Sequence, residues 1–129
     1  MKSTVIHSPD APAPGAAYSQ ARVAGPFLFT SGCGPIDAKS GRIAGATVTE
    51  QTRLTLANLR TLLAADGLDL TDVVKATVYL QDLERDYDVF NLAYAELMPA
   101  PWPARTTVGA DLTGILIEID FVALRRAVA

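Results

Sequence analysis

Apolar and polar side chains alternate along residues 73–80. A period of two predicts a β-strand that turns one face toward a core. The expected core face consists of Val74, Ala76, Val78 and Leu80. Segments with helical periodicity lie on both sides of this strand in the sequence, so the fold must combine a half-buried strand with helices that cover it.

The first helix is predicted to begin near Thr47, because Thr47 and Glu50 stand at capping-box spacing. Asp66-Gly67 is a helix stop, and the apolar stripe between these ends contains Leu56, Leu59, Leu62 and Leu63. The second helix is predicted over residues 84–97, and prolines that start at Pro99 end it. Its apolar side is expected to carry Tyr87, Phe90, Tyr94 and Leu97.

Four further short strands are predicted, at residues 22–23 and 27–31 around a Gly25-Pro26 turn, and at residues 105–108 and 115–124. The order is therefore strands, helix, strand, helix, strands. Two helices cannot cover both faces of so wide a sheet. We predict an α+β fold, a single domain over residues 1–129 with both helices packed on one face of a mixed sheet.

The uncovered sheet face is expected to become a subunit interface. One face of the last predicted strand is half apolar and half acidic, with Leu116, Glu118, Asp120, Val122 and Leu124. Such a surface suits an interface that contains a polar pocket better than it suits open solvent.

Charge and residue counts exclude several classes of function. The net charge is −3 and no basic stripe is visible, which argues against a nucleic-acid partner. No apolar run approaches the ~18 residues of a membrane span, and the first nine residues have no signal-peptide pattern. With the single Cys33, this predicts a cytoplasmic protein without membrane association.

The same counts predict no metal and no cofactor. One cysteine and one histidine cannot supply the four ligands of a structural zinc site. His7, in a proline-adjacent segment, is expected at the surface, which leaves no base for serine or cysteine catalysis. Neither a Walker loop nor a G-x-G-x-x-G motif is present.

Two charged residues are candidates for chemistry. Arg105 follows a proline-stiffened segment, and its guanidinium is shaped to bind a carboxylate through two hydrogen bonds. Residue type alone favours a surface arginine in an ion pair. Glu118 lies inside an apolar strand, where it is either on a solvated face or part of a site. A carboxylate beside an apolar wall can act as a general base.

Other polar residues have a structural interpretation beside a functional one. Asn91 falls on the apolar side of the second helix, where a helix-contact asparagine is the simpler hypothesis. Tyr18 is a packing aromatic by type, and Cys33 has no neighbour that would lower its pKa. The run Ser31-Gly32-Cys33-Gly34 is either a strand-ending turn or a set of amides open to an anion.

Several of these motifs, in this order, resemble the Rid family (reactive intermediate deaminase, YjgF-like, formerly "endoribonuclease L-PSP"). The matching segments cover nearly the whole chain: Tyr18-Ser19-Gln20-Ala21, Thr30-Ser31-Gly32, Gln51-Thr52 with Asn58-Leu59, residues 72–80, Phe90-Asn91 with Tyr94, Pro103-Ala104-Arg105, and Ile117-Glu118-Ile119.

The resemblance implies a chorismate-mutase-like fold with a six-stranded sheet, assembled as a homotrimer with clefts between subunits. It implies hydrolysis of imines and enamines such as 2-aminoacrylate to 2-keto acids and ammonia, without a cofactor. Arg105 would bind the substrate carboxylate, and Glu118 would position or activate water. The implied cleft residues are Tyr18, Ser31, Gly32, Asn91 and Thr107.

Departures from the family pattern concern the substrate more than the reaction. Thr107 stands where many relatives have cysteine, and Cys33-Gly34 replaces a glutamine and an apolar residue. Asp120 either shares the acid–base role or pairs across the interface. The alternatives to a deaminase are a non-catalytic trimer that binds a small ligand or partner, and an endoribonuclease.

Overall fold

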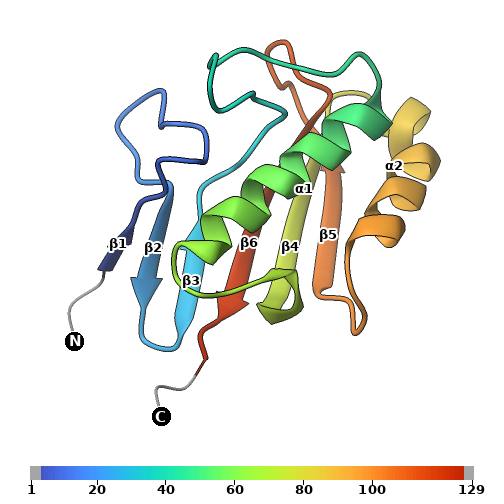
Figure 1. Ribbon diagram of the computed structural model, residues 1–129. Helices are drawn as coiled ribbons and strands as arrows, with labels where there is room; N and C mark the ends of the chain where they lie inside the picture. The colour runs from blue at the N-terminus through green and yellow to red at the C-terminus, as the bar shows by residue number, and fades with distance from the viewer. Residues whose placement is uncertain (1–3, 127–129) are drawn as a thin grey trace.

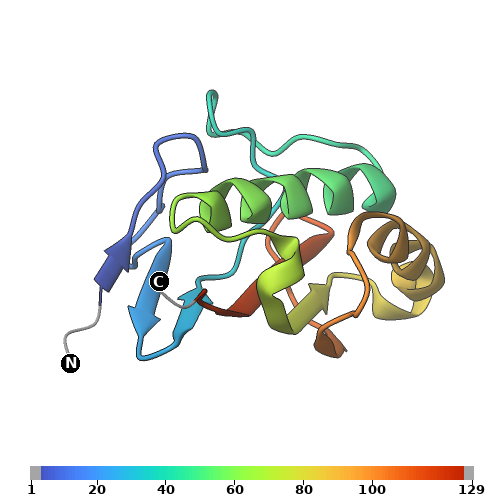
Figure 2. The same ribbon diagram turned by 60° about the horizontal axis from the view of Figure 1, so that its bottom comes forward.

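The computed structural model describes residues 4–126. Residues 1–3 and 127–129 lie outside the described residues. Both stretches belong to the predicted domain, and residues 1–3 also belong to the N-terminal segment that has no signal-peptide pattern. Within residues 4–126, six strands form one sheet in the order β1-β2-β3-β6-β4-β5, and both α-helices lie on one side of it (Figures 1 and 2). The predicted α+β architecture is confirmed.

The strands are β1 (Thr4–Ile6), β2 (Ala21–Ala24), β3 (Phe27–Thr30), β4 (Val73–Leu80), β5 (Ala104–Gly109) and β6 (Ile117–Leu124). The helices are α1 (Val48–Ala64) and α2 (Leu83–Leu97), with a 3-10 turn at Leu70–Asp72. Strands β4 and β5 run parallel, and each other pair of neighbours in the sheet is antiparallel, so the sheet is mixed.

Helix α1 follows its sequence pattern closely. The Thr47 hydroxyl accepts from the Glu50 amide at 3.1 Å, and the Glu50 carboxylate returns to the amide of Ala46 and not to that of Thr47. Gly67 takes φ +72°, a conformation that favours glycine, just after the helix. The predicted stripe of Leu56, Leu59, Leu62 and Leu63 is buried.

The predicted stripe of α2 is only partly right. Phe90 and Tyr94 are buried, but Tyr87 is 41% exposed and Leu97 is also exposed. Helix α2 lies at the edge of the layer, against α1 and β4, and therefore buries a narrow stripe. The side chains buried there are Asp86, Phe90, Ala93 and Tyr94.

The prediction for Val74 is wrong. A register shift between Val73 and Lys75 in the β4–β6 pairing adds one residue to β4, so Val73 turns inward and Val74 is 41% exposed. Such a bulge reverses the alternation locally. Beyond it, Ala76, Val78 and Leu80 are buried as predicted.

Strand β1 was not among the individually predicted strands, because three residues are too few for a periodic pattern. The segment after it is irregular, as expected, and the buried Gln20 side chain holds it. The side-chain Oε1 of Gln20 accepts from the backbone amide of Ser8 at 2.7 Å, and its side-chain Nε2 donates to the backbone carbonyl of Pro12 at 2.9 Å. This arrangement positions Tyr18.

The two faces of the sheet differ. The helix-covered face holds the core, to which β6 contributes Ile117, Ile119, Phe121 and Ala123. No helix of residues 4–126 covers the other face, where β6 carries the half-buried Glu118 and Asp120. The pairing register places exposed apolar side chains on that open face, namely Phe27, Phe29, Val108 and Leu124.

Candidate functional site

The first cavity, of about 380 Å³, lies where β3 ends beside β6. Four of the predicted site residues line it: Tyr18, Ser31, Gly32 and Glu118. The chain leaves β3 at Thr30 and runs along β6, where Cys33 and Ile119 exchange two backbone hydrogen bonds of 2.8 and 2.9 Å. This bridge brings Gly32 next to Glu118.

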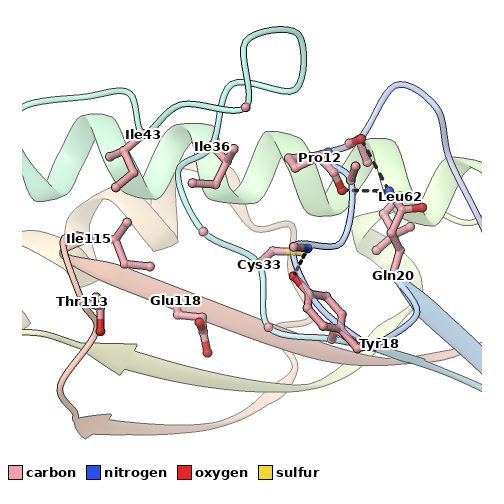
Figure 3. Close-up of a pocket in the computed structure, with 17 residues that line it drawn as sticks. Pro12, Tyr18, Gln20, Cys33, Ile36, Ile43, Leu62, Thr113, Ile115 and Glu118 are labelled. Atoms are coloured by element: carbon pink, nitrogen blue, oxygen red, sulfur yellow. Dashed lines mark hydrogen bonds between the residues drawn. The ribbon is translucent and has the colours of Figure 1, made fainter.

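Gly32 leaves room for the carboxylate of Glu118. A Cβ at position 32 would lie 2.6 Å from Oε2 of Glu118, closer than real Cβ atoms approach. Figure 3 shows Ile36, Ile43 and Ile115 together above Glu118. Burial raises the pKa of Glu118, and the negative charge of Asp120 raises it further. The shift moves this carboxyl group toward the range in which a general base works.

Asp120 lies two residues from Glu118 on the same face of β6, and its pKa is also raised by burial. Hydrogen bonds from Tyr79 and Thr77 on β4 oppose this shift, as does the charge of Lys75. Burial, together with the charges of Glu118 and Asp120, raises the pKa of Cys33 to about 12. A thiol with this pKa is protonated at neutral pH, which supports a structural role for Cys33.

The other two predicted residues of this cavity, Ser31 and Tyr18, already make hydrogen bonds within the chain. The Ser31 hydroxyl donates to the Ser19 carbonyl at 2.6 Å, so it secures the turn after β3. The Tyr18 hydroxyl accepts from the Gly15 amide at 3.2 Å (Figure 3) and keeps its own proton to donate. Tyr18 is exposed and lies at the surface of the cavity.

The second cavity, of about 330 Å³, contains Arg105 and lies between α2 and β5. The Arg105 Nη2 donates to Oδ1 of Asn91 at 2.7 Å. The guanidinium carbon lies 4.8 Å from the ring centroid of Tyr94 and 5.2 Å from that of Phe90, within cation–π range. Asn91 on α2 therefore contacts Arg105 on β5, and this contact orients the guanidinium.

Arg105 has no carboxylate within ion-pair distance among residues 4–126. The hypothesis of a surface ion pair is therefore wrong within the described chain. One amide and two aromatic rings hold the guanidinium instead, and most of its five donors stay available. The chemistry of a guanidinium held in this way suits the binding of a carboxylate.

Within one chain, Arg105 and Glu118 do not share a cavity. Arg105 pairs with Ala76, whose side chain faces the helices, whereas Glu118 pairs with Tyr79, whose side chain faces the open side. Thr107 shares the helix side with Arg105, lines neither cavity, and its buried hydroxyl has no hydrogen-bond partner within residues 4–126.

Three further observations concern candidate site residues. His7 is exposed, as predicted. In the part of the chain that the structure describes, no group of three or more His, Cys, Asp or Glu side chains is placed to hold a metal ion. Sequence inspection did not single out Trp102, which lines the Arg105 cavity; its place between two prolines, three residues before Arg105, was the available signal.

The comparisons with known proteins all point to one family. The family model described as Endoribonuclease L-PSP matches residues 8–125. A RutC family protein of Pyrococcus horikoshii is 42% identical over 124 residues, which cover 95% of this chain and 98% of that protein. The chloroplastic Reactive Intermediate Deaminase A of Arabidopsis thaliana is 38% identical over 125 residues, covering 95% of this chain and 66% of that protein.

Solved structures agree with this assignment. Escherichia coli TdcF, whose structure holds a bound serine, superposes with a TM-score of 0.88 at 32% identity and covers 95% of this chain and 99% of its own. No helix within residues 4–126 has the length and apolar character needed to cross a membrane. By its sequence and its fold, the chain belongs to the Endoribonuclease L-PSP family, which is the YjgF or Rid family.

Proposed function

We propose that this protein hydrolyses reactive 2-imino acids and their enamine tautomers, of the 2-aminoacrylate type, to 2-keto acids and ammonia. The observation that carries the proposal is Arg105, a preorganised guanidinium that opens into a cavity and has no carboxylate partner within residues 4–126. The name of the Arabidopsis relative supports a deaminase. The carboxylate of the substrate would take the free donors of Arg105.

A complete site needs two chains. Arg105 and Glu118 lie on opposite faces of one sheet, so one small substrate cannot contact both within a single chain. The exposed apolar side chains of the open face favour its burial in an assembly, for which we propose the homotrimer implied by the family resemblance. One subunit would supply Glu118 with Tyr18, Ser31 and Gly32, and its neighbour would supply Arg105 with Asn91 and Thr107.

The proposed reaction needs positioning and one acid–base group, and it uses no cofactor. Arg105 holds the substrate carboxylate so that the C=N carbon meets a water molecule beside Glu118. Glu118 accepts a proton from this water as its oxygen bonds to carbon, and Glu118 then returns that proton to the nitrogen as the C=N double bond becomes a single bond. The resulting carbinolamine then loses ammonia as its C–N bond breaks and the carbonyl forms. The raised pKa of Glu118 suits a group that both accepts and returns a proton.

A ligand-binding trimer without catalysis is the second candidate, and the serine bound in TdcF is the observation that favours it. An endoribonuclease, which the family description names, is a weaker candidate because the net charge of −3 comes without a basic stripe. The cytoplasm stays the predicted compartment.

The test is to generate 2-iminopropanoate in solution and follow its disappearance with and without the protein. Arg105→Ala should reduce kcat/KM by about 10- to 150-fold, because a hydrogen bond to a charged group contributes about 1.5–3 kcal/mol. The matched control is Arg53→Ala, which removes an exposed ion pair with Glu96 of 3.5 Å and should leave the rate unchanged.

Four results separate the candidates. Equal rates for wild type and Arg105→Ala would refute the proposed role of Arg105. Wild-type protein that binds 2-keto acids but accelerates no hydrolysis would favour the binding trimer. A stable monomer in a light-scattering measurement would exclude a site built from two chains, and salt-sensitive cleavage of RNA would favour the endoribonuclease.

A further inference from the structure

The Arg105 cavity has more apolar wall than a three-carbon acid needs. Beside the polar groups of Arg105 and Asn91, its lining consists of Tyr94, Ala95, Trp102 and Pro103. Tyr94 is 5% exposed and its hydroxyl is buried, so it presents its ring to the cavity and not its oxygen. The cavity therefore joins a carboxylate anchor to an aromatic and aliphatic surface.

Trp102 is the unusual member of this wall. It is 61% exposed, the largest value among the exposed aromatic side chains of the described residues. Its indole Nε1 donates to the Met98 carbonyl at 3.1 Å, and Pro101 and Pro103 flank it in the chain. The indole N–H is thus satisfied by the protein, and the apolar ring surface is held in place with little freedom left to lose on binding.

We propose that the substrates of this site are 2-imino acids with a large apolar side chain, branched or aromatic, and that Trp102 determines this specificity. The proposal rests on the proposed deaminase function and names its substrate class. With the carboxylate on Arg105, the side chain of such a substrate packs against Trp102, Ala95 and Pro103. The cavity volume of about 330 Å³ falls within the range of pockets that bind ligands much larger than 2-aminoacrylate.

The chemistry agrees with this assignment. A hydrogen or a methyl group as the substrate side chain is too small to make much contact with an aromatic wall. In an apolar pocket, each added methylene changes kcat/KM by roughly 10- to 200-fold. The wall offers no side-chain hydrogen-bond group of its own, because the Trp102 donor is used and the Tyr94 hydroxyl is buried. Imino acids with polar side chains are therefore disfavoured.

The experiment compares kcat/KM for the imino acids derived from alanine, serine, leucine and phenylalanine, each generated in solution by an amino-acid oxidase and corrected for spontaneous hydrolysis. We expect the leucine or phenylalanine imine to exceed the alanine imine by about tenfold or more. Trp102→Ala should remove most of this preference and change the alanine imine by less than about threefold. Trp102→Phe should keep the preference, since a ring remains.

Leu92→Ala is the matched control, because Leu92 is a 75% exposed apolar residue of α2 that does not line the cavity. It should leave the order of substrates unchanged. A wild-type preference for the alanine or serine imine overturns the proposal while it leaves the deaminase function standing. Acceleration of none of the four imines overturns both.

Two outcomes for Trp102→Ala also overturn the proposal. An equal loss for all four imines makes Trp102 a general structural residue. Dissociation of the assembly, measured by light scattering on the same variant, makes Trp102 a subunit contact. Loss confined to the bulky imines, with the assembly intact, supports its role in specificity.

Discussion

Replacing Gly32 with alanine tests whether the position of the Glu118 carboxylate matters for activity. A Cβ at residue 32 would lie 2.6 Å from Oε2 and 2.7 Å from Cδ of Glu118. Ordinary van der Waals contact begins at 3.4 Å, so Oε2 has to move by 0.8 Å. The backbone of Gly32 is not in the left-handed region and accepts alanine without strain.

The displaced group is the end of a flexible side chain, so the folded state should lose little stability. We expect the free energy of unfolding of Gly32→Ala to stay within about 1 kcal/mol of wild type, because a reduced entropy of the unfolded chain offsets part of the contact. Activity should respond far more. A displacement near 1 Å lowers catalysis by about 10²-fold, so kcat/KM should fall by roughly 30- to 100-fold.

The assay measures the hydrolysis of a 2-imino acid and, on the same samples, urea unfolding. Gly109→Ala is the matched control, because Gly109 lines neither cavity and its Cβ would meet the Cβ of Leu83 at 3.3 Å and not a carboxylate. It should keep kcat/KM within about threefold of wild type, since an aliphatic side chain can yield by a few tenths of an ångström. Wild-type activity in Gly32→Ala would refute the proposed role of the Glu118 position.

Three further predictions follow from pKa shifts and packing. Asp120→Asn removes a charge that helps to raise the pKa of Glu118, so the acid limb of kcat/KM should move to lower pH; an unmoved limb contradicts this coupling. Leu80→Ala should lower the free energy of unfolding by about 2–5 kcal/mol and Val74→Ala by less than about 1 kcal/mol in urea titrations, whereas equal losses would contradict the bulge. The pKa of Cys33, about 12, predicts slow alkylation of the native protein by iodoacetamide at pH 8 relative to unfolded protein, and Glu118→Gln should accelerate it. Equal alkylation rates for native and unfolded protein would contradict the raised pKa of this half-buried thiol.

Local patterns predicted the elements that they encode. The leucine stripe of α1 is buried as predicted, and the side chains of β6 alternate between the core and the open face, because both repeats depend only on neighbouring residues. The wrong burial predictions occur where a contact between distant segments determines which way a side chain faces. Val74 turns outward because β4 gains a bulge against β6, and Tyr87 is exposed because α2 lies at the edge of the layer.

The candidate residues were also visible in the sequence, but their arrangement was not. Arg105 and Glu118 were selected by residue type and family resemblance. Residue type and family resemblance could not reveal that Asn91 and two aromatic rings hold Arg105. They also could not reveal that Gly32 makes room for Glu118. These contacts join segments that are far apart in the sequence.

The sequence by itself determined the fold class, the number of helices and the family, because these follow from periodicity and from motifs in order along the chain. Only the tertiary structure decided which side of the sheet each candidate residue faces. The parallel β4–β5 register turns Arg105 toward the helices, and the antiparallel β4–β6 register turns Glu118 to the open side. A shift of one residue in either register would reverse the face, and register is set by packing between strands and not by the local sequence of either strand.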